Sequence, residues 1–94
     1  MVERLGERFD REQERFDEEW KSFLRFPTVG ADPTHHPDCA DCAAWLRDHL
    51  AGIGLQAETL ETTRLPAVYA EHRTGRDAPT ILFYGHYDVQ PADP

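Results

Sequence analysis

The feature that most constrains the fold is an unbroken apolar run near the end of the chain, Ile-Leu-Phe-Tyr, which is followed at once by Gly-His-Tyr-Asp and then Val-Gln-Pro. An apolar run without alternating polar residues predicts a strand that is buried on both faces, as in a parallel sheet. In open α/β sheets, ligands bind at the carboxyl ends of such strands. We therefore expect a strand over residues 80–84, with chemistry at His86 and Asp88 directly after it.

The preceding sequence predicts two helices followed by two further strands. Apolar residues at steps of three, four and seven predict a helix over residues 2–25 whose apolar stripe faces a partner element, and Pro27 helps to end this helix. A second helix over residues 37–51 begins with a proline, which suits a first helical position. Strands are expected over residues 55–62 and 67–72. The order helix, helix, strand, strand, strand predicts the opening part of an α/β fold, incomplete as it stands.

Composition narrows the class of protein. The chain has 94 residues, enough for one small domain, and a formal net charge of -8. A negative chain without a basic stripe is a poor candidate for binding nucleic acid. No apolar run approaches the ~20 residues that span a bilayer, and the first residues lack the hydrophobic core of a signal peptide. We therefore expect a cytoplasmic protein with no membrane partner.

Acidic and basic residues at spacings of three and four predict an ion-paired, solvated face on the first helix.

A first candidate site lies at the start of the second helix. His35, His36, Cys39 and Cys42 are residue types that hold structural zinc, so a small zinc-binding module is one interpretation. The spacing favours another, because adjacent histidines do not easily turn toward one ion. Both cysteines also fall on the apolar stripe of the helix, where small thiols pack well. The stripe was expected to continue through Leu46, Leu50 and Ile53, so we expect both cysteines to be buried.

The second candidate site is the Gly-His-Tyr-Asp segment. Residues two apart in an extended segment point to the same side, so His86 can face a metal while Asp88 lies near enough to orient its ring. Gly85 allows a close approach or a sharp turn of the backbone as the strand ends. The simpler interpretation, a surface histidine beside a solvated aspartate, is common for an isolated His-x-Asp pair.

The whole segment over residues 81–91 closely resembles the first metal motif of the co-catalytic zinc exopeptidases, the family that includes carnosinase-like dipeptidases, aminoacylase and succinyl-diaminopimelate desuccinylase. Tyr87 and the Val-Gln-Pro sequence resemble the dipeptidase branch. Weaker similarities support this over residues 23–29, 43–46 and 65–70.

The resemblance implies a three-layer α/β/α catalytic domain that binds two zinc ions, with manganese or cobalt as alternatives. It implies that His86 is a ligand of one zinc and that Asp88 is the active-site residue that positions its imidazole. It further implies a metallopeptidase that hydrolyses peptide or amide bonds of small peptides or dipeptides with a metal-activated water.

In this family, the remaining ligands, the general base and a lid or dimerisation domain lie downstream of the motif. Residues 1–94 are therefore expected to be the N-terminal portion of a catalytic domain, inactive alone, and a homodimer is one arrangement open to the full-length protein. A non-catalytic truncated product is a further alternative.

Overall fold

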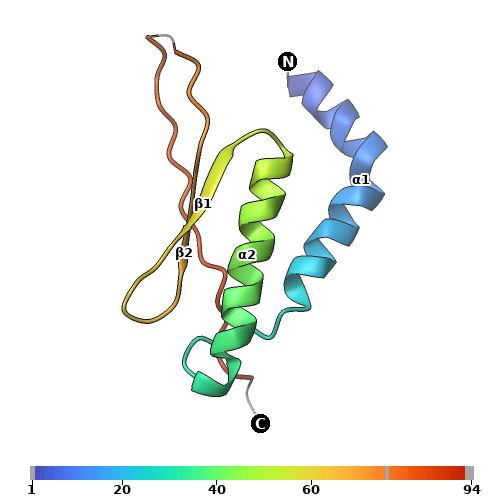
Figure 1. The fold of residues 1–94 in the computed structure, drawn as a ribbon. Helices are drawn as coiled ribbons and strands as arrows, with labels where there is room; N and C mark the ends of the chain where they lie inside the picture. Colours follow the sequence, from blue (N-terminus) through green and yellow to red (C-terminus); the bar gives the residue numbers. More distant parts are fainter. Residues whose placement is uncertain (1, 76, 93–94) are drawn as a thin grey trace.

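The computed structural model describes residues 2–75 and 77–92. In chain order, the elements are α1 (Val2–Leu24), the 3₁₀ helix η1 (Pro33–His35), α2 (His36–Gly52), β1 (Gln56–Leu60) and β2 (Ala67–Glu71). The two strands form an antiparallel hairpin against α2, while α1 diverges from α2 toward the N-terminus (Figure 1). These elements confirm the α/β class, both helices and the first two strands.

Helix α2 has local signals at both ends. Pro37 occupies the first turn, where its missing N–H costs nothing, and Asp38 places a negative charge near the positive end of the helix dipole. At the other end, Gly54 adopts φ +104°, a left-handed conformation that glycine reaches without a steric penalty. The chain can therefore reverse directly into β1 and lay the hairpin against α2.

The hairpin buries one face by alternation, which is broken only at Glu71 at the end of β2. Ala57 pairs with Ala70 and Thr59 with Val68, and all four are half-buried. Glu58, which lies between Ala57 and Thr59 on β1, is exposed. Because successive side chains of a strand point to opposite faces, this register places the small apolar residues of both strands on the same side.

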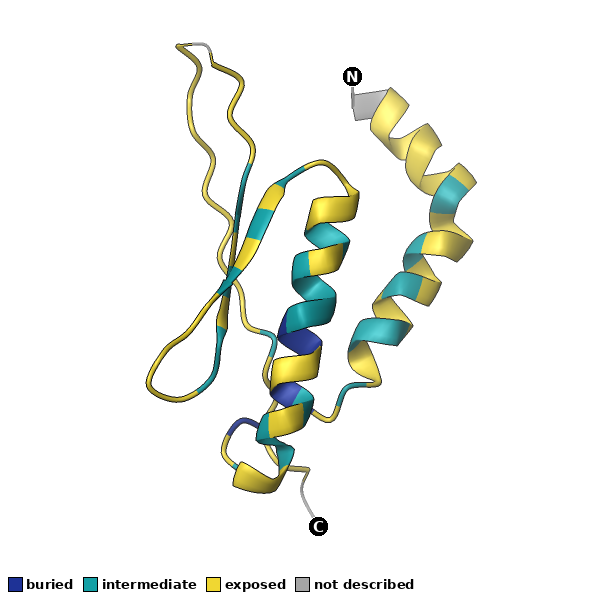
Figure 2. Cartoon of the chain, in the orientation of Figure 1, coloured by how far each residue is buried: buried dark blue, intermediate teal, exposed yellow. Residues whose placement is uncertain are grey.

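The core is small and lies on α2. Cys39, Cys42 and Ala43 are fully buried, as the dark segments of that helix show in Figure 2. The expected burial of both cysteines is confirmed. Ile53, however, was placed on the same stripe and is 59% exposed. It follows the last helical residue, so the helical periodicity on which that prediction rested no longer applies.

Helix α1 joins the core only near its C-terminal end, where the ring of Phe23 lies 6.1 Å from that of Trp45 on α2. Its apolar stripe was expected to face a partner element, but Leu5, Phe9 and Trp20 are exposed.

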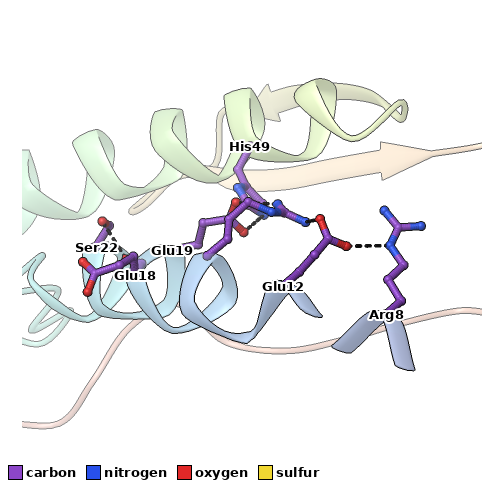
Figure 3. A network of polar contacts seen from close by, with 7 residues as sticks. Arg8, Glu12, Glu18, Glu19, Ser22 and His49 are labelled. Atoms are coloured by element: carbon purple, nitrogen blue, oxygen red, sulfur yellow. Dashed lines mark hydrogen bonds and ion pairs between the residues drawn. The ribbon is translucent and has the colours of Figure 1, made fainter. Parts of the chain in front are cut away.

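The expected ion-paired face of α1 is confirmed. Arg8 pairs with Glu12 at 2.8 Å, Glu12 with Arg15 at 2.8 Å, and Arg15 with Glu19 at 2.7 Å. His49 on α2 lies 3.8 Å from Glu19 and links this chain of charges to the second helix (Figure 3).

The expected strand over residues 80–84 is not formed, and the expectation that it is buried on both faces is wrong. The side chains from Ile81 to Tyr84 are between 76% and 89% exposed, and this stretch forms no strand pairing within the described part of the chain. A strand is stabilised by pairing with neighbours and by covering its side chains. The two-stranded hairpin and α2 provide neither here.

Within residues 2–75 and 77–92, no helix is both long and apolar enough to cross a membrane.

Candidate functional site

The segment after the apolar run is tied to the loop that follows α1. Val29 and Val89 form a parallel bridge, and the Val89 N–H donates a hydrogen bond of 2.8 Å to the Thr28 carbonyl. The Thr28 hydroxyl donates a second bond, of 2.7 Å, to the Tyr87 carbonyl. Two pieces of chain that are nearly 60 residues apart in sequence are thereby held side by side.

A third bond attaches this segment to the hairpin. The hydroxyl of Tyr87 donates to the carbonyl of Pro66, just before β2, at 2.5 Å. Burial raises the pKa of the Tyr87 hydroxyl, and the nearby groups Cys39, Cys42 and Asp88 raise this pKa further. Tyr87 therefore stays protonated through the physiological range and remains a hydrogen-bond donor.

His86 and Asp88 lie together on this segment. Nδ1 of His86 is 3.6 Å from Oδ1 of Asp88, and Nε2 is 3.4 Å from the hydroxyl of Tyr84. The Tyr84 and His86 rings meet edge to face with centroids 5.4 Å apart. The histidine side chain is 71% exposed and the aspartate 49%. One ring nitrogen thus faces a carboxylate and the other faces the Tyr84 hydroxyl, an arrangement in which the carboxylate can set the tautomer and orientation of the imidazole.

The Asp88 carboxylate borders a hollow of about 430 Å³ between the loop after α1 and the turn that joins β1 to β2. The hollow is lined by Gly30, Ala31, Thr62, Arg64, Leu65 and Asp88. A Cβ atom on Gly30 would lie 3.1 Å from Oδ2 of Asp88 and 3.3 Å from Cδ1 of Leu65. The absence of a side chain at Gly30 is therefore what allows the carboxylate to approach the loop.

The donor chemistry of His86 and Asp88 fits one ligand of a zinc ion with the carboxylate that orients it. A catalytic zinc has three protein ligands and a structural zinc has four. Among the residues that the structure describes, no three His, Cys, Asp or Glu side chains gather in a way that could hold a metal. The pair by itself is therefore too few side chains to hold a metal ion.

The His-Cys cluster does not converge on one point. Nδ1 of His35 lies 2.8 Å from Oδ2 of Asp38, and Nε2 of His36 lies 3.2 Å from the Gly30 carbonyl. Both cysteines are free thiols inside the core. Burial raises the pKa of Cys42 to about 11, with a further contribution from Cys39.

The pKa of Cys39 is also raised, first by burial and then by the charges of Asp88 and Asp38. Metal-binding thiols need the deprotonated form, so this environment opposes the structural zinc module.

Sequence reasoning missed the residues that fix the segment. Thr28 is buried, at 3% exposure. The family resemblance over residues 23–29 includes it without giving it a role, and no sequence signal gave a role to Gly30. Tyr87 supported the dipeptidase resemblance but carried no structural role. A polar residue directly after a proline at the end of a helix is a weak signal, and only the fold reveals its partners.

Comparison with known proteins places this geometry in context. The chain is 38% identical over 64 residues to a succinyl-diaminopimelate desuccinylase from Bordetella avium, which covers 68% of the chain. It is 33% identical over 91 residues to the Cys-Gly metallodipeptidase DUG1 from Candida albicans, which covers 83% of the chain. No protein-family model and no solved structure matches the chain.

These relatives confirm the resemblance that the residues around His86 indicated: the chain is a homologue of the zinc exopeptidases that include desuccinylases and metallodipeptidases. The matched stretches correspond to 16% and 19% of the length of the two relatives, so the chain spans less than a fifth of either.

Proposed function

We propose that the chain is the N-terminal part of the catalytic domain of a metal-dependent peptidase, with His86 as a metal ligand and Asp88 as the residue that positions its imidazole. The observation that carries this proposal is the 3.6 Å pairing of Nδ1 of His86 with Oδ1 of Asp88. The pair lies within a segment whose sequence resembles the first metal motif of the family, and the two curated relatives support the same class of hydrolase.

In this role, Asp88 accepts a hydrogen bond from Nδ1–H of His86. That bond fixes the tautomer, leaves the lone pair of Nε2 for the metal and makes the imidazole a better ligand. When bound, the metal supplies Lewis acidity and an activated water for amide hydrolysis. The remaining ligands and the general base come from parts of the polypeptide beyond these residues, so we expect the 94 residues to be inactive alone.

The substrate class follows from the dipeptidase-like features of the motif. Tyr87 and the Val-Gln-Pro sequence favour a dipeptidase, and one relative is named a Cys-Gly metallodipeptidase. We propose a small peptide or dipeptide as substrate and a pair of zinc ions as cofactor, with manganese or cobalt as alternatives. A cytoplasmic location and a homodimer of the full-length protein remain predictions of the sequence.

The test is metal analysis of the full-length polypeptide that carries this sequence. His86→Ala should lose one bound metal ion and hydrolysis of a Cys-Gly dipeptide, because an imidazole ligand has no substitute at that position. Asp88→Asn should weaken metal binding by about 10–100-fold, the usual cost of losing a residue that orients a ligand.

A matched control is His72→Ala, an exposed histidine just beyond β2. It should leave metal content and turnover unchanged. Undiminished metal content and turnover in His86→Ala would contradict the proposed function. Metal-dependent turnover by the 94-residue chain alone would contradict its expected inactivity.

A further inference from the structure

We propose that Thr28 is a positioning residue for the metal-binding segment, a role that rests on the proposed function of His86 and Asp88. The Thr28 hydroxyl donates a hydrogen bond to the Tyr87 carbonyl, and the Thr28 carbonyl accepts one from the Val89 N–H. We call these two bonds the Thr28 clamp.

The Thr28 clamp brackets Asp88. One bond holds the residue before the aspartate through its carbonyl, and the other holds the residue after it through its N–H. The two bonds therefore fix the direction in which the Asp88 side chain leaves the backbone. Thr28 is 3% exposed, so water has little access with which to replace its hydroxyl. The bond itself is partly buried, so leaving the Tyr87 carbonyl without its donor carries a cost.

Gly30 adds a constraint on the carboxylate itself. The nearest approach to a Cβ built on Gly30 would be Oδ2 of Asp88, at 3.1 Å, which is closer than a side chain normally comes. The other carboxylate oxygen, Oδ1, is the one that faces Nδ1 of His86. The loop after α1 thus holds the backbone of Asp88 through Thr28 and receives one of its oxygens at Gly30, while the second oxygen is directed to the imidazole.

The segment that precedes the motif cannot hold His86 and Asp88 in place. Residues 80–84 form no strand and are exposed, so in the described chain they do not provide a rigid support for His86. The support comes from the other side of the motif, through the bridge between Val29 and Val89 and through Tyr87, whose hydroxyl bonds to Pro66. The Thr28 clamp adds to these attachments; a substitution at Thr28 removes its hydroxyl bond to Tyr87 and leaves the backbone bond from Val89 in place.

The experiment compares Thr28→Val, which has the same shape but lacks the hydroxyl, with Thr28→Ser, which keeps it. Both are made in the full-length polypeptide. Two quantities are measured: the hydrogen–deuterium exchange rate of the Val89 amide, and the affinity for zinc in a competition titration. The matched control is Thr34→Val, which removes a hydroxyl of η1 that bonds to Asp32 and not to the motif.

We expect Thr28→Val to exchange the Val89 amide about tenfold faster and to bind zinc about tenfold more weakly, while amides of the β1–β2 hairpin keep their rates. Thr28→Ser should restore both values to within about twofold, and Thr34→Val should change neither. If Thr28→Val fails to fold, Gly30→Ala provides the same test, because it moves the Asp88 carboxylate without removing a hydrogen bond; weaker zinc binding is again expected.

Faster exchange at Val89 with unchanged zinc affinity would overturn the positioning role, since the clamp would then serve the fold alone. Unchanged exchange and affinity in Thr28→Val would overturn it as well. Failure of the proposed function is recognised separately, because His86→Ala would then retain its metal whatever the Thr28 variants do.

Discussion

Two apolar stretches of this chain differ in burial: one is buried and the other is exposed. The inner face of α2 buries Cys39, Cys42 and Ala43 completely, whereas the side chains of residues 81–84 are almost fully exposed although they are larger and more apolar. The difference lies in what surrounds each stretch. The inner face of α2 is covered by the hairpin and by the loop after α1, while the apolar run has no strand beside it in the described chain. Hydrophobicity creates the tendency to be buried, and packing partners decide whether it is realised.

The largest difference in stability between the two stretches is expected when a charge is placed in each of them. Ala43→Asp introduces an unpaired charge into the core, which costs about 3–5 kcal/mol, comparable with the whole stability of a small domain. We expect it to abolish cooperative thermal unfolding, followed by circular dichroism. Leu82→Asp should leave the melting curve of the 94-residue chain within experimental scatter, because its side chain is 88% exposed. Equal losses from the two substitutions would show that the apolar run is packed after all.

Two glycines at the end of α2 allow a smaller test within the packed region. Gly54 has φ +104°, so Gly54→Ala should destabilise the chain by about 1–2 kcal/mol. Gly52 is helical with no atom within 4 Å of a Cβ built on it, so Gly52→Ala should stabilise by about 0.4–1 kcal/mol. Urea unfolding measures both changes, and a loss of stability in Gly52→Ala would contradict the described end of the helix.

The loss of folding stability at alkaline pH tests whether Cys42 is buried in the core. Burial raises the pKa of Cys42 from 9.0 to about 11, so the unfolded state releases this proton at lower pH than the folded state. The stabilisation is fully present below pH 9 and is lost as pH rises toward 11. We expect a moderate fall in urea midpoint over this window and a shallower fall in Cys42→Ala, with Cys39 and Tyr87 contributing in the same direction. Identical pH profiles would indicate that Cys42 is solvated.

The smallest effect is expected on α1, away from the core. Glu12→Gln removes the carboxylate that pairs with both Arg8 and Arg15. Those pairs lower the pKa of Glu12, so their small stabilisation is present above its unfolded pKa of 4.5 and is lost in acid. Helicity should fall slightly at neutral pH and low salt, and the difference should vanish near pH 3 or in 1 M salt. A difference that persists in 1 M salt would point to packing rather than charge.

The sequence predicted those parts of the fold whose signals are local. Periodicity and proline positions predicted both helices, strand-like composition predicted β1 and β2, and the packing role of Cys39 and Cys42 followed from their place on a stripe. The strand over residues 80–84 was wrong because its formation depends on neighbouring strands, which no local pattern encodes. The apolar stripe of α1 was real, but its coverage depends on tertiary contacts for the same reason.

For the candidate site, the sequence indicated His86 and Asp88 through a motif and a two-residue spacing. It could not indicate that Thr28 and Gly30 contact the motif, although Thr28 lies in the family-like stretch 23–29, because those contacts exist only after the loop following α1 and residues 87–89 have been brought together. The assignment of a metal ligand and its orienting carboxylate stays a prediction that the metal analysis above decides.

The bridge between Val29 and Val89 has a consequence for how this chain folds. Closing a loop of this length is entropically expensive until both helices and the hairpin have reduced the chain between its ends. Contacts of such high sequence separation slow the search for the native topology. We therefore expect helical signals to recover first in a refolding experiment and protection at Val89 to arrive last, so that the surroundings of His86 and Asp88 are the last part of the chain to order.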